Sequence, residues 1–236
     1  MTVSENISII RSRIADAAAL SGRRGTDILL VAAAKTNPAS AVAEAISAGV
    51  DAIGENRVQE MLDKHGQGAY KGAPLHLIGH LQRNKVRNVV GVVDLIESAD
   101  SAELLGMIDA RAKLLGITQD VLLEINIGGE LSKSGLEPHL LFPVLDTVAS
   151  LEHIRVRGLM AIPPISSIKG ENRPYFAQMY KLFVDIGAKK YDNVSMDFLS
   201  MGMSGDFEDA IAEGSNMVRI GSAIFGARSY PVCGGV

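Results

Sequence analysis

The sequence has 236 residues, of which 47% are hydrophobic and 21% are charged, and its formal net charge is −4. These values are typical of a globular protein, and the acidic balance argues against a nucleic-acid-binding surface. Because no basic leader precedes an apolar run, and no stretch of about 18 apolar residues occurs, we expect a cytoplasmic protein without a membrane segment.

The first predicted element is an amphipathic helix at residues 3–20. Apolar residues recur at helical spacing from Val3 to Ile14. Thr2 and Glu5 can form a capping box at its start, and the segment "SGRRGTD" ends it. We expect this helix to pack on the outside of the fold.

A strand, a loop and a helix follow, and this unit then repeats along the chain. The β-rich run at 28–33 leads to Pro38 and to a helix at 39–48, which Gly49 ends. We predict eight strands, at 28–33, 51–55, 75–79, 92–98, 120–126, 154–160, 196–200 and 216–221. We predict the remaining helices near 57–65, 82–89, 101–115, 137–150, 174–187 and 205–213.

Eight strands that alternate with helices indicate parallel strands joined by crossover helices. An open doubly wound sheet of this kind more often has five or six strands. The sequence therefore predicts a closed (β/α)8 TIM-type barrel over residues 1–236, a single domain with the extra helix at 3–20 packed on it.

Two glycine- and serine-rich segments lie at the ends of the last two predicted strands. They are "SMGMSGD" at 200–206 and "RIGSAIFG" at 219–226, and each leads towards a helix start. Such turns present backbone N–H groups and hydroxyls to an anion, although plain turns with helix caps use the same residues. Since barrels often bind phosphate in the loops after strands seven and eight, the pair predicts a phosphate site.

In the segment "ILLVAAAKTNP" at 28–38, an apolar run is followed directly by Lys35. A lysine is unusual at this position because it is seldom buried without a partner. A lysine that faces a phosphate site suits a phosphorylated carbonyl compound, because a desolvated amine is nucleophilic enough to form a Schiff base. Pyridoxal 5′-phosphate (PLP) carries both groups. A lysine whose ammonium group simply emerges into solvent remains the alternative interpretation.

Arg219 closes the eighth predicted strand. Because arginine keeps its proton in proteins, an arginine that faced the pyridine nitrogen of PLP would disfavour protonation of the ring. The cofactor would then be a weak electron sink. This arrangement leans away from strong carbanion chemistry.

Seven segments of the chain carry a family resemblance. They are "VAAAKTNP", "AIGENRVQE", "LHLIGHLQRNK", "IESADS", "VLLEINIGGELSKSGL", "VRGLMAIPP" and "LSMGMSGDFEDAIAEGSNMVRIGSAIFGAR". In this order the sequence resembles the pyridoxal phosphate homeostasis protein family, whose barrel is similar to the N-terminal domain of alanine racemase. The resemblance runs from about residue 28 to 228, which is nearly the whole chain.

The resemblance implies a set of cofactor-binding residues. It implies that Lys35 carries the PLP aldimine, that Arg219 faces the pyridine nitrogen and that Asn56 lies near the ring. The phosphate ligands that it implies are Ser200, Gly221 and Ser222, with Ser204 assisting. Met201 is a candidate for packing against the ligand, although for Met201 and Met203 simple core or loop packing is an equal alternative.

The resemblance also implies a protein that binds, buffers or delivers PLP, with effects on amino-acid and keto-acid balance, and not a robust enzyme. We therefore predict no catalytic residue, and we name PLP-requiring apoenzymes as candidate recipients. A two-base racemase needs a second proton-transfer group, which in alanine racemases comes from a separate C-terminal domain of a dimer partner. Because the sequence stops at Val236, we expect that group to be absent and the protein to be a monomer.

Two enzymatic alternatives stay open at this point. A small PLP-dependent racemase could use water or a loop residue as its second base. A barrel aldolase could form its Schiff base with a sugar phosphate, and it would be colourless without the cofactor. Isotope exchange and the visible spectrum separate these hypotheses.

Other motifs carry less information. The basic residues of "HLQRNKVRN", Arg83, Lys85 and Arg87, are interpreted as a solvated helix face and not as an RNA contact. The segment "GGELSKSG" lacks the glycine that a nucleotide-binding loop has before its lysine. The five histidines are scattered, so no metal site is predicted. The lone Cys233 excludes an internal disulfide, and we assign it no role.

Overall fold

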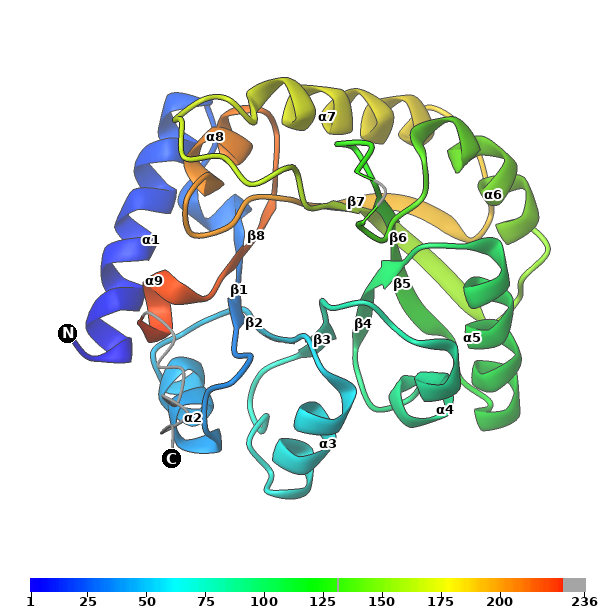
Figure 1. Ribbon diagram of the computed structural model, residues 1–236, viewed down its shortest axis with the longest axis horizontal. Coiled ribbons are helices and arrows are strands. Elements are labelled where there is room, and N and C mark those ends of the chain that lie inside the picture. Colours follow the sequence, from blue (N-terminus) through cyan, green and yellow to red (C-terminus); the bar gives the residue numbers. More distant parts are fainter. Residues whose placement is uncertain (131, 227–236) are drawn as a thin grey trace, which may run out of the picture.

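The computed structural model describes residues 1–130 and 132–226. Eight parallel strands form a closed barrel in chain order, and the first strand pairs with the last (Figure 1). The strands are β1 (Leu29–Ala33), β2 (Ala52–Glu55), β3 (Leu75–Leu77), β4 (Leu95–Ala99), β5 (Gln119–Ile125), β6 (Ile154–Ala161), β7 (Val194–Ser200) and β8 (Met217–Ile220). The predicted (β/α)8 barrel and its eight strands are confirmed.

Helices surround this barrel, and each expected helix is present with small changes at its ends (Figure 1). They are α2 (Ala39–Ser47), α3 (Val58–Gly66), α4 (Val86–Val89), α5 (Ala102–Leu115), α6 (Leu141–Val148), α7 (Arg173–Gly187), α8 (Phe207–Ala212) and α9 (Ser222–Phe225). The predicted helices at 82–89 and 137–150 begin instead as short 3₁₀ turns, η2 (Arg83–Lys85) and η3 (Pro138–Leu140). Such turns are frequent where a helix begins.

The extra N-terminal helix, α1 (Val3–Leu20), packs on the outside of the barrel as expected. Its capping box is formed: the Glu5 amide donates to the Thr2 hydroxyl, and the Thr2 amide donates to the Glu5 carboxylate. The helix lies beside α8 and α9 (Figure 1), and the Asn6 side-chain amide donates to the Ile224 carbonyl at 2.8 Å. The helix α1 therefore supports the outer side of the turn that follows β8.

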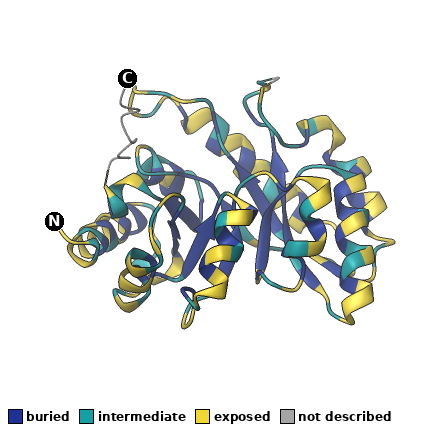
Figure 2. Ribbon diagram, turned by 60° about the horizontal axis from the view of Figure 1, so that its bottom comes forward, coloured by how far each residue is buried: buried dark blue, intermediate teal, exposed yellow. Residues whose placement is uncertain are grey.

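The core has two layers. The larger layer lies between the strands and the helices, and most of the strands are coloured as buried in Figure 2, although the first part of β7 is only half-buried. The smaller layer fills the barrel interior with residues such as Val31, Ala52, Leu122 and Met160. Parallel strands buried on both faces require near-continuous apolar runs, which is why the sequence pattern locates them well. No helix in the described ranges is long and apolar enough to cross a membrane.

Candidate cofactor site

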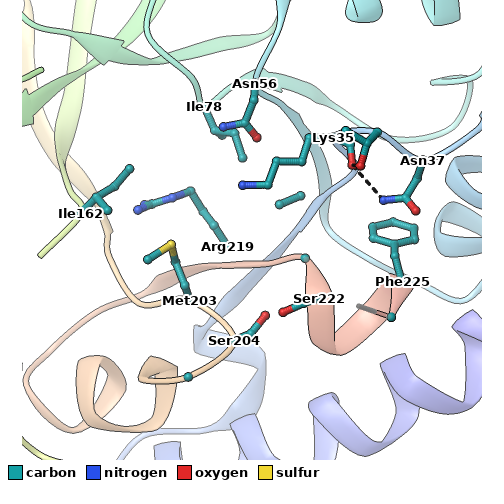
Figure 3. Close-up of a pocket in the computed structure, with 15 residues that line it drawn as sticks. Lys35, Asn37, Asn56, Ile78, Ile162, Met203, Ser204, Arg219, Ser222 and Phe225 are labelled. Atoms are coloured by element: carbon teal, nitrogen blue, oxygen red, sulfur yellow. Dashed lines mark hydrogen bonds between the residues drawn. The ribbon is translucent and has the colours of Figure 1, made fainter. Parts of the chain in front are cut away.

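A cavity of about 410 Å³ opens at the carboxyl ends of the strands (Figure 3), a size typical of small-ligand sites. It is lined by Ala33, Lys35, Thr36, Asn37, Asn56, Ile78, Ile162, Met203, Ser204, Gly205, Arg219, Gly221, Ser222, Phe225 and Gly226. Six of the seven predicted site residues therefore lie together here. The seventh, Ser200, does not line the cavity.

Lys35 lies in the turn between β1 and α2. Figure 3 shows its side chain extending into the cavity, with the amine between Asn56 and Arg219 in this view. The carbonyl of Lys35 accepts hydrogen bonds from the Asn37 side-chain amide at 3.0 Å and from the Thr36 hydroxyl at 2.6 Å. These bonds fix the backbone from which the amine projects.

Two serine- and glycine-containing turns form the opposite wall. The hydroxyls of Ser204 and Ser222 point toward one another in Figure 3. Helix α9 begins at Ser222, and the amide of Ala223 donates to the Ser204 hydroxyl at 3.3 Å, which joins the two turns. A Cβ atom at Gly221 would lie 3.2 Å from the Ala33 carbonyl oxygen, so glycine keeps this wall open. This is a suitable arrangement for an anion.

Asn56 follows β2 and forms a third part of the wall. Its Oδ1 atom is buried and has no hydrogen-bond partner among the described residues. Its backbone packs so tightly on Gly79 that a Cβ atom there would lie 2.3 Å from the Asn56 carbonyl oxygen. A buried amide oxygen without a partner is rare in folded proteins, so this atom has the capacity to accept a hydrogen bond from a polar ligand.

Arg219 projects from β8 and is almost completely buried. Its Nη1 donates to the Ser200 hydroxyl at 2.5 Å, and its Nη2 donates to the Ala161 carbonyl at 3.0 Å. Burial lowers the pKa of Arg219, while the negative charges of Glu97, Glu124 and Asp206 oppose this effect. The guanidinium keeps its proton, as arginine does in proteins, so it presents only donors to the cavity.

Beneath Arg219, a hydrogen-bond network runs through the barrel interior. The Ser200 hydroxyl, which accepts from Arg219, donates to Glu97 Oε2 at 2.6 Å, and Glu97 Oε1 lies 2.7 Å from His76 Nδ1. Burial alone raises the pKa of Glu97, but the hydrogen bond and charge of His76, the charge of Arg219 and the Ser200 hydrogen bond outweigh it. The net effect lowers the pKa of Glu97, so it is a carboxylate.

Comparison with known proteins identifies the family. The family model described as "Alanine racemase, N-terminal domain" matches residues 6–229. A pyridoxal phosphate homeostasis protein of Aquifex aeolicus is 42% identical over 98% of this chain and 100% of its own length. The protein of that name from Escherichia coli K12 is also 42% identical, over 97% of each chain. The chain belongs to the pyridoxal phosphate homeostasis protein family.

A solved structure agrees with this assignment. PipY of Synechococcus elongatus, determined with PLP bound, has 32% sequence identity and a TM-score of 0.83, and the match covers 95% of this chain and 100% of PipY. The resemblance stated from the sequence to the pyridoxal phosphate homeostasis protein family is therefore confirmed.

The cavity residues of this family member fit the chemistry of PLP. The cofactor has an aldehyde, a phenolic hydroxyl, a pyridine nitrogen and a phosphate. The cavity offers one amine at Lys35, an amide oxygen at Asn56 that has no partner among the described residues, a guanidinium at Arg219 and the two serine-containing turns. Each polar group of the cofactor thus has a complementary group in the wall.

Ser200 lies away from the cavity. The family resemblance implies that this residue binds phosphate, whereas in the structure its hydroxyl lies inside the barrel between Glu97 and Arg219. Met201 is likewise buried in the core, whereas Met203 lines the cavity. The strand β7 ends at Ser200, so its side chain still points inward, and only the following turn reaches the cavity.

Sequence reasoning missed several cavity residues in this pyridoxal phosphate homeostasis protein. Thr36, Asn37, Ile78, Ile162 and Phe225 line the cavity without having been singled out. Their position directly after predicted strands or beside predicted site residues was the available signal.

The motifs that were given lesser weight lie elsewhere. His80 pairs with Asp100 at 3.1 Å and borders a different cavity. Arg83 pairs with Glu103 on the exposed face. No group of three metal-ligating side chains occurs in residues 1–130 and 132–226. Cys233 lies outside the described residues.

Proposed function

We propose that this chain binds PLP reversibly through Lys35 and takes part in PLP homeostasis, by buffering the cofactor or delivering it. The observation that carries this proposal is the convergence of Lys35, Asn56, Arg219 and the two serine-containing turns on one cavity. The names of the relatives and the PipY structure with PLP bound support it. Through its effect on PLP supply, the protein would influence amino-acid and keto-acid balance indirectly.

When bound, PLP supplies an aldehyde that condenses with a primary amine, forming a C=N bond and releasing water. Lys35 supplies that amine. The Ser204 and Ser222 hydroxyls, with Gly221 beside them, would hold the phosphate. Arg219 would donate to the pyridine nitrogen and keep it unprotonated. Asn56 would hydrogen-bond a polar substituent of the ring.

We propose binding rather than turnover as the main role. Of the described residues that line the cavity, only Lys35 and Arg219 are ionisable. Arginine keeps its proton, so Lys35 is the one group there that can exchange protons readily, and two-base racemisation needs two such groups. This composition supports a cofactor-binding protein over the racemase alternative.

The visible spectrum of the purified protein, before and after borohydride reduction, tests the cofactor assignment. We expect a yellow protein in which reduction fixes a pyridoxyl group on Lys35, located by peptide mass spectrometry. The Lys35→Ala variant should carry no adduct, whereas Lys71→Ala, which removes an exposed lysine, should behave like the wild type. Absence of any adduct after excess PLP would overturn the assignment.

Isotope exchange tests the racemase alternative. The PLP-loaded protein is incubated with L-alanine in deuterated water, and α-deuteration and D-alanine are measured over many turnovers. We expect neither to accumulate. Sustained exchange with a growing D-isomer fraction would contradict a purely binding role.

Transfer of PLP to a PLP-requiring apoenzyme is the delivery form of the same proposal. Mixing the loaded protein with an apoenzyme and following the recovery of enzyme activity tests it, with free PLP at the same concentration as the control. We also propose a monomer acting in the cytoplasm. Sedimentation at low micromolar concentration tests the monomer, and a stable dimer would contradict it.

A further inference from the structure

A cluster of ionic and polar side chains lies behind the turn that carries Lys35. This α3 cluster consists of Glu55, Glu60, Lys64 and Tyr70. The Lys64 side chain is only 7% exposed, and its Nζ lies 2.8 Å from Glu55 Oε1, 2.8 Å from Glu60 Oε1 and 3.0 Å from the Ala34 carbonyl. All three protons of the ammonium group therefore have an acceptor, which is what makes its burial tolerable.

The same cluster binds the backbone on both sides of Lys35. The Lys64 ammonium donates to the carbonyl of Ala34, and the carboxylate of Glu60 accepts the amide of Thr36 at 2.5 Å. Glu60 and Lys64 are also hydrogen-bonded to each other, so the residues on both sides of Lys35 are held by one connected pair of side chains. We call these bonds the bracket around residue 35.

Thr36 adopts a backbone conformation that needs such support. Its φ angle is 64°, and it is the only residue other than glycine in the described ranges with a positive φ. For an L-residue the left-handed region costs about 1–2 kcal/mol, so it persists where surrounding contacts hold it. The bond from the Thr36 amide to Glu60 is one such contact.

The α3 cluster does not itself line the cofactor cavity. Thr36 and Asn37 border both that cavity and an open groove that Glu60 and Lys64 line, so the turn is the wall between the two spaces. Tyr70 donates to Glu55 Oε1 at 3.0 Å and further fixes the carboxylate that holds Lys64. Glu60 and Lys64 thus reach the cavity through the backbone of the Lys35 turn, whereas Glu55 directly precedes the cavity residue Asn56.

From this bracket we propose that Glu60 and Lys64 are positioning residues, which hold the backbone at positions 34–36 so that the Lys35 amine meets the aldehyde of PLP. The inference rests on the proposed function, since it concerns the covalent step at Lys35. The alternative is that the cluster only anchors α3 to β2. The two interpretations differ in whether covalent binding is lost separately from non-covalent binding.

The test compares two ligands on matched variants. PLP can condense with Lys35, whereas pyridoxine 5′-phosphate carries the same ring and phosphate but has an alcohol in place of the aldehyde. Glu60→Ala removes the acceptor for Thr36, and Glu60→Gln restores a neutral acceptor. Glu103→Ala, which breaks an exposed ion pair with Arg83 at the same end of the barrel, is the control. Thermal melts of each variant show whether it is folded.

We expect Glu60→Ala to weaken PLP binding about tenfold and to leave pyridoxine 5′-phosphate binding within about twofold of wild type, as loss of one charge-assisted hydrogen bond implies. Glu60→Gln should recover part of the PLP affinity, and Glu103→Ala should change neither ligand. An equal loss for both ligands, or no loss for either, would overturn the positioning role.

Hydrogen exchange in the ligand-free protein gives a second readout that needs no cofactor. The Thr36 amide should exchange faster in Glu60→Ala, by about tenfold, and at the wild-type rate in Glu103→Ala. An unchanged exchange rate at the Thr36 amide would show that Glu60 does not hold this turn. If the wild type formed no adduct with PLP, the proposed function would fail on its own, and the exchange rates would still decide whether Glu60 holds the turn.

Discussion

Arg219 and Glu97 face each other inside the barrel with Nη1 and Oε2 3.8 Å apart, and the hydroxyl of Ser200 makes hydrogen bonds to both. The guanidinium is therefore held from below by a carboxylate that never reaches the cavity. His76 occupies the second oxygen of that carboxylate. The guanidinium that lines the cavity is thus connected to three buried residues from three other strands.

Replacement of Glu97 by Gln should destabilise the protein in a pH-dependent way. At neutral pH we expect the free energy of unfolding to fall by about 3 kcal/mol, because the charge of Arg219 loses its buried partner. The pKa of Glu97 is lowered from 4.5 in the folded protein, so its stabilising effect is present above pH 4.5 and is lost as the pH falls further.

Urea titrations of the wild type and Glu97→Gln at several pH values check this prediction. The difference in unfolding free energy should narrow as the pH falls below the reference pKa of 4.5. Glu55 and Glu124, whose pKa values are raised by burial, are present in both proteins, so their effects should largely cancel in the difference. A difference independent of pH would contradict the buried ion pair.

Two serine substitutions should affect different properties, one ligand affinity and the other stability. Ser222→Ala should weaken binding of inorganic phosphate about tenfold with little effect on the free energy of unfolding, because Ser222 is exposed at the cavity wall. Ser200→Ala should lower the free energy of unfolding by about 1–2 kcal/mol and leave affinity for inorganic phosphate unchanged within about twofold.

Calorimetric titration and urea denaturation of the two serine variants check both halves of that prediction. A loss of phosphate affinity in Ser200→Ala comparable to that in Ser222→Ala would return Ser200 to the role that the sequence suggested.

Two glycine substitutions should change the free energy of unfolding in opposite directions. Gly79→Ala should destabilise the protein by about 3 kcal/mol, since its Cβ atom would lie 2.3 Å from the Asn56 carbonyl oxygen and the backbone would have to shift. Gly106→Ala, in the middle of α5 with open space around the new Cβ atom, should stabilise it by about 0.5–1 kcal/mol.

Thermal and urea unfolding of the two variants side by side measure the contrast. Because Gly79 supports Asn56, its substitution should also weaken PLP binding, whereas Gly106→Ala should not. A neutral Gly79→Ala would show that the backbone at Asn56 has room to move.

The fold could be predicted from the sequence because its signals are local. Most strands are buried on both faces and appear in the sequence as short apolar runs, with β7 the main exception, and each helix has its own periodicity and end signals. The helix predicted at 82–89 begins in the structure as a 3₁₀ turn. Its pattern of apolar residues is compatible with either a 3₁₀ turn or an α-helix. The closed topology then follows from the number of repeats.

The cavity could be predicted in part for the same reason. Lys35, Asn56 and Arg219 are polar residues within or just after apolar strands, and a barrel brings the strand ends together. The network beneath Arg219 could not be predicted, because His76, Glu97 and Ser200 come from β3, β4 and β7, and no local pattern links them. Glu60 and Lys64 stand four residues apart, a spacing that usually indicates a surface pair.

The pairing of β1 with β8 has a consequence for how the protein is made. Lys35 follows the first strand and Arg219 belongs to the last, so the two meet only when the barrel closes. During synthesis the amine emerges from the ribosome long before the guanidinium and the turn at Ser222, and a partly built chain lacks half of the cavity wall. A ligand that needs both walls stabilises only the closed barrel. We therefore expect the protein to bind its cofactor only after the barrel has closed.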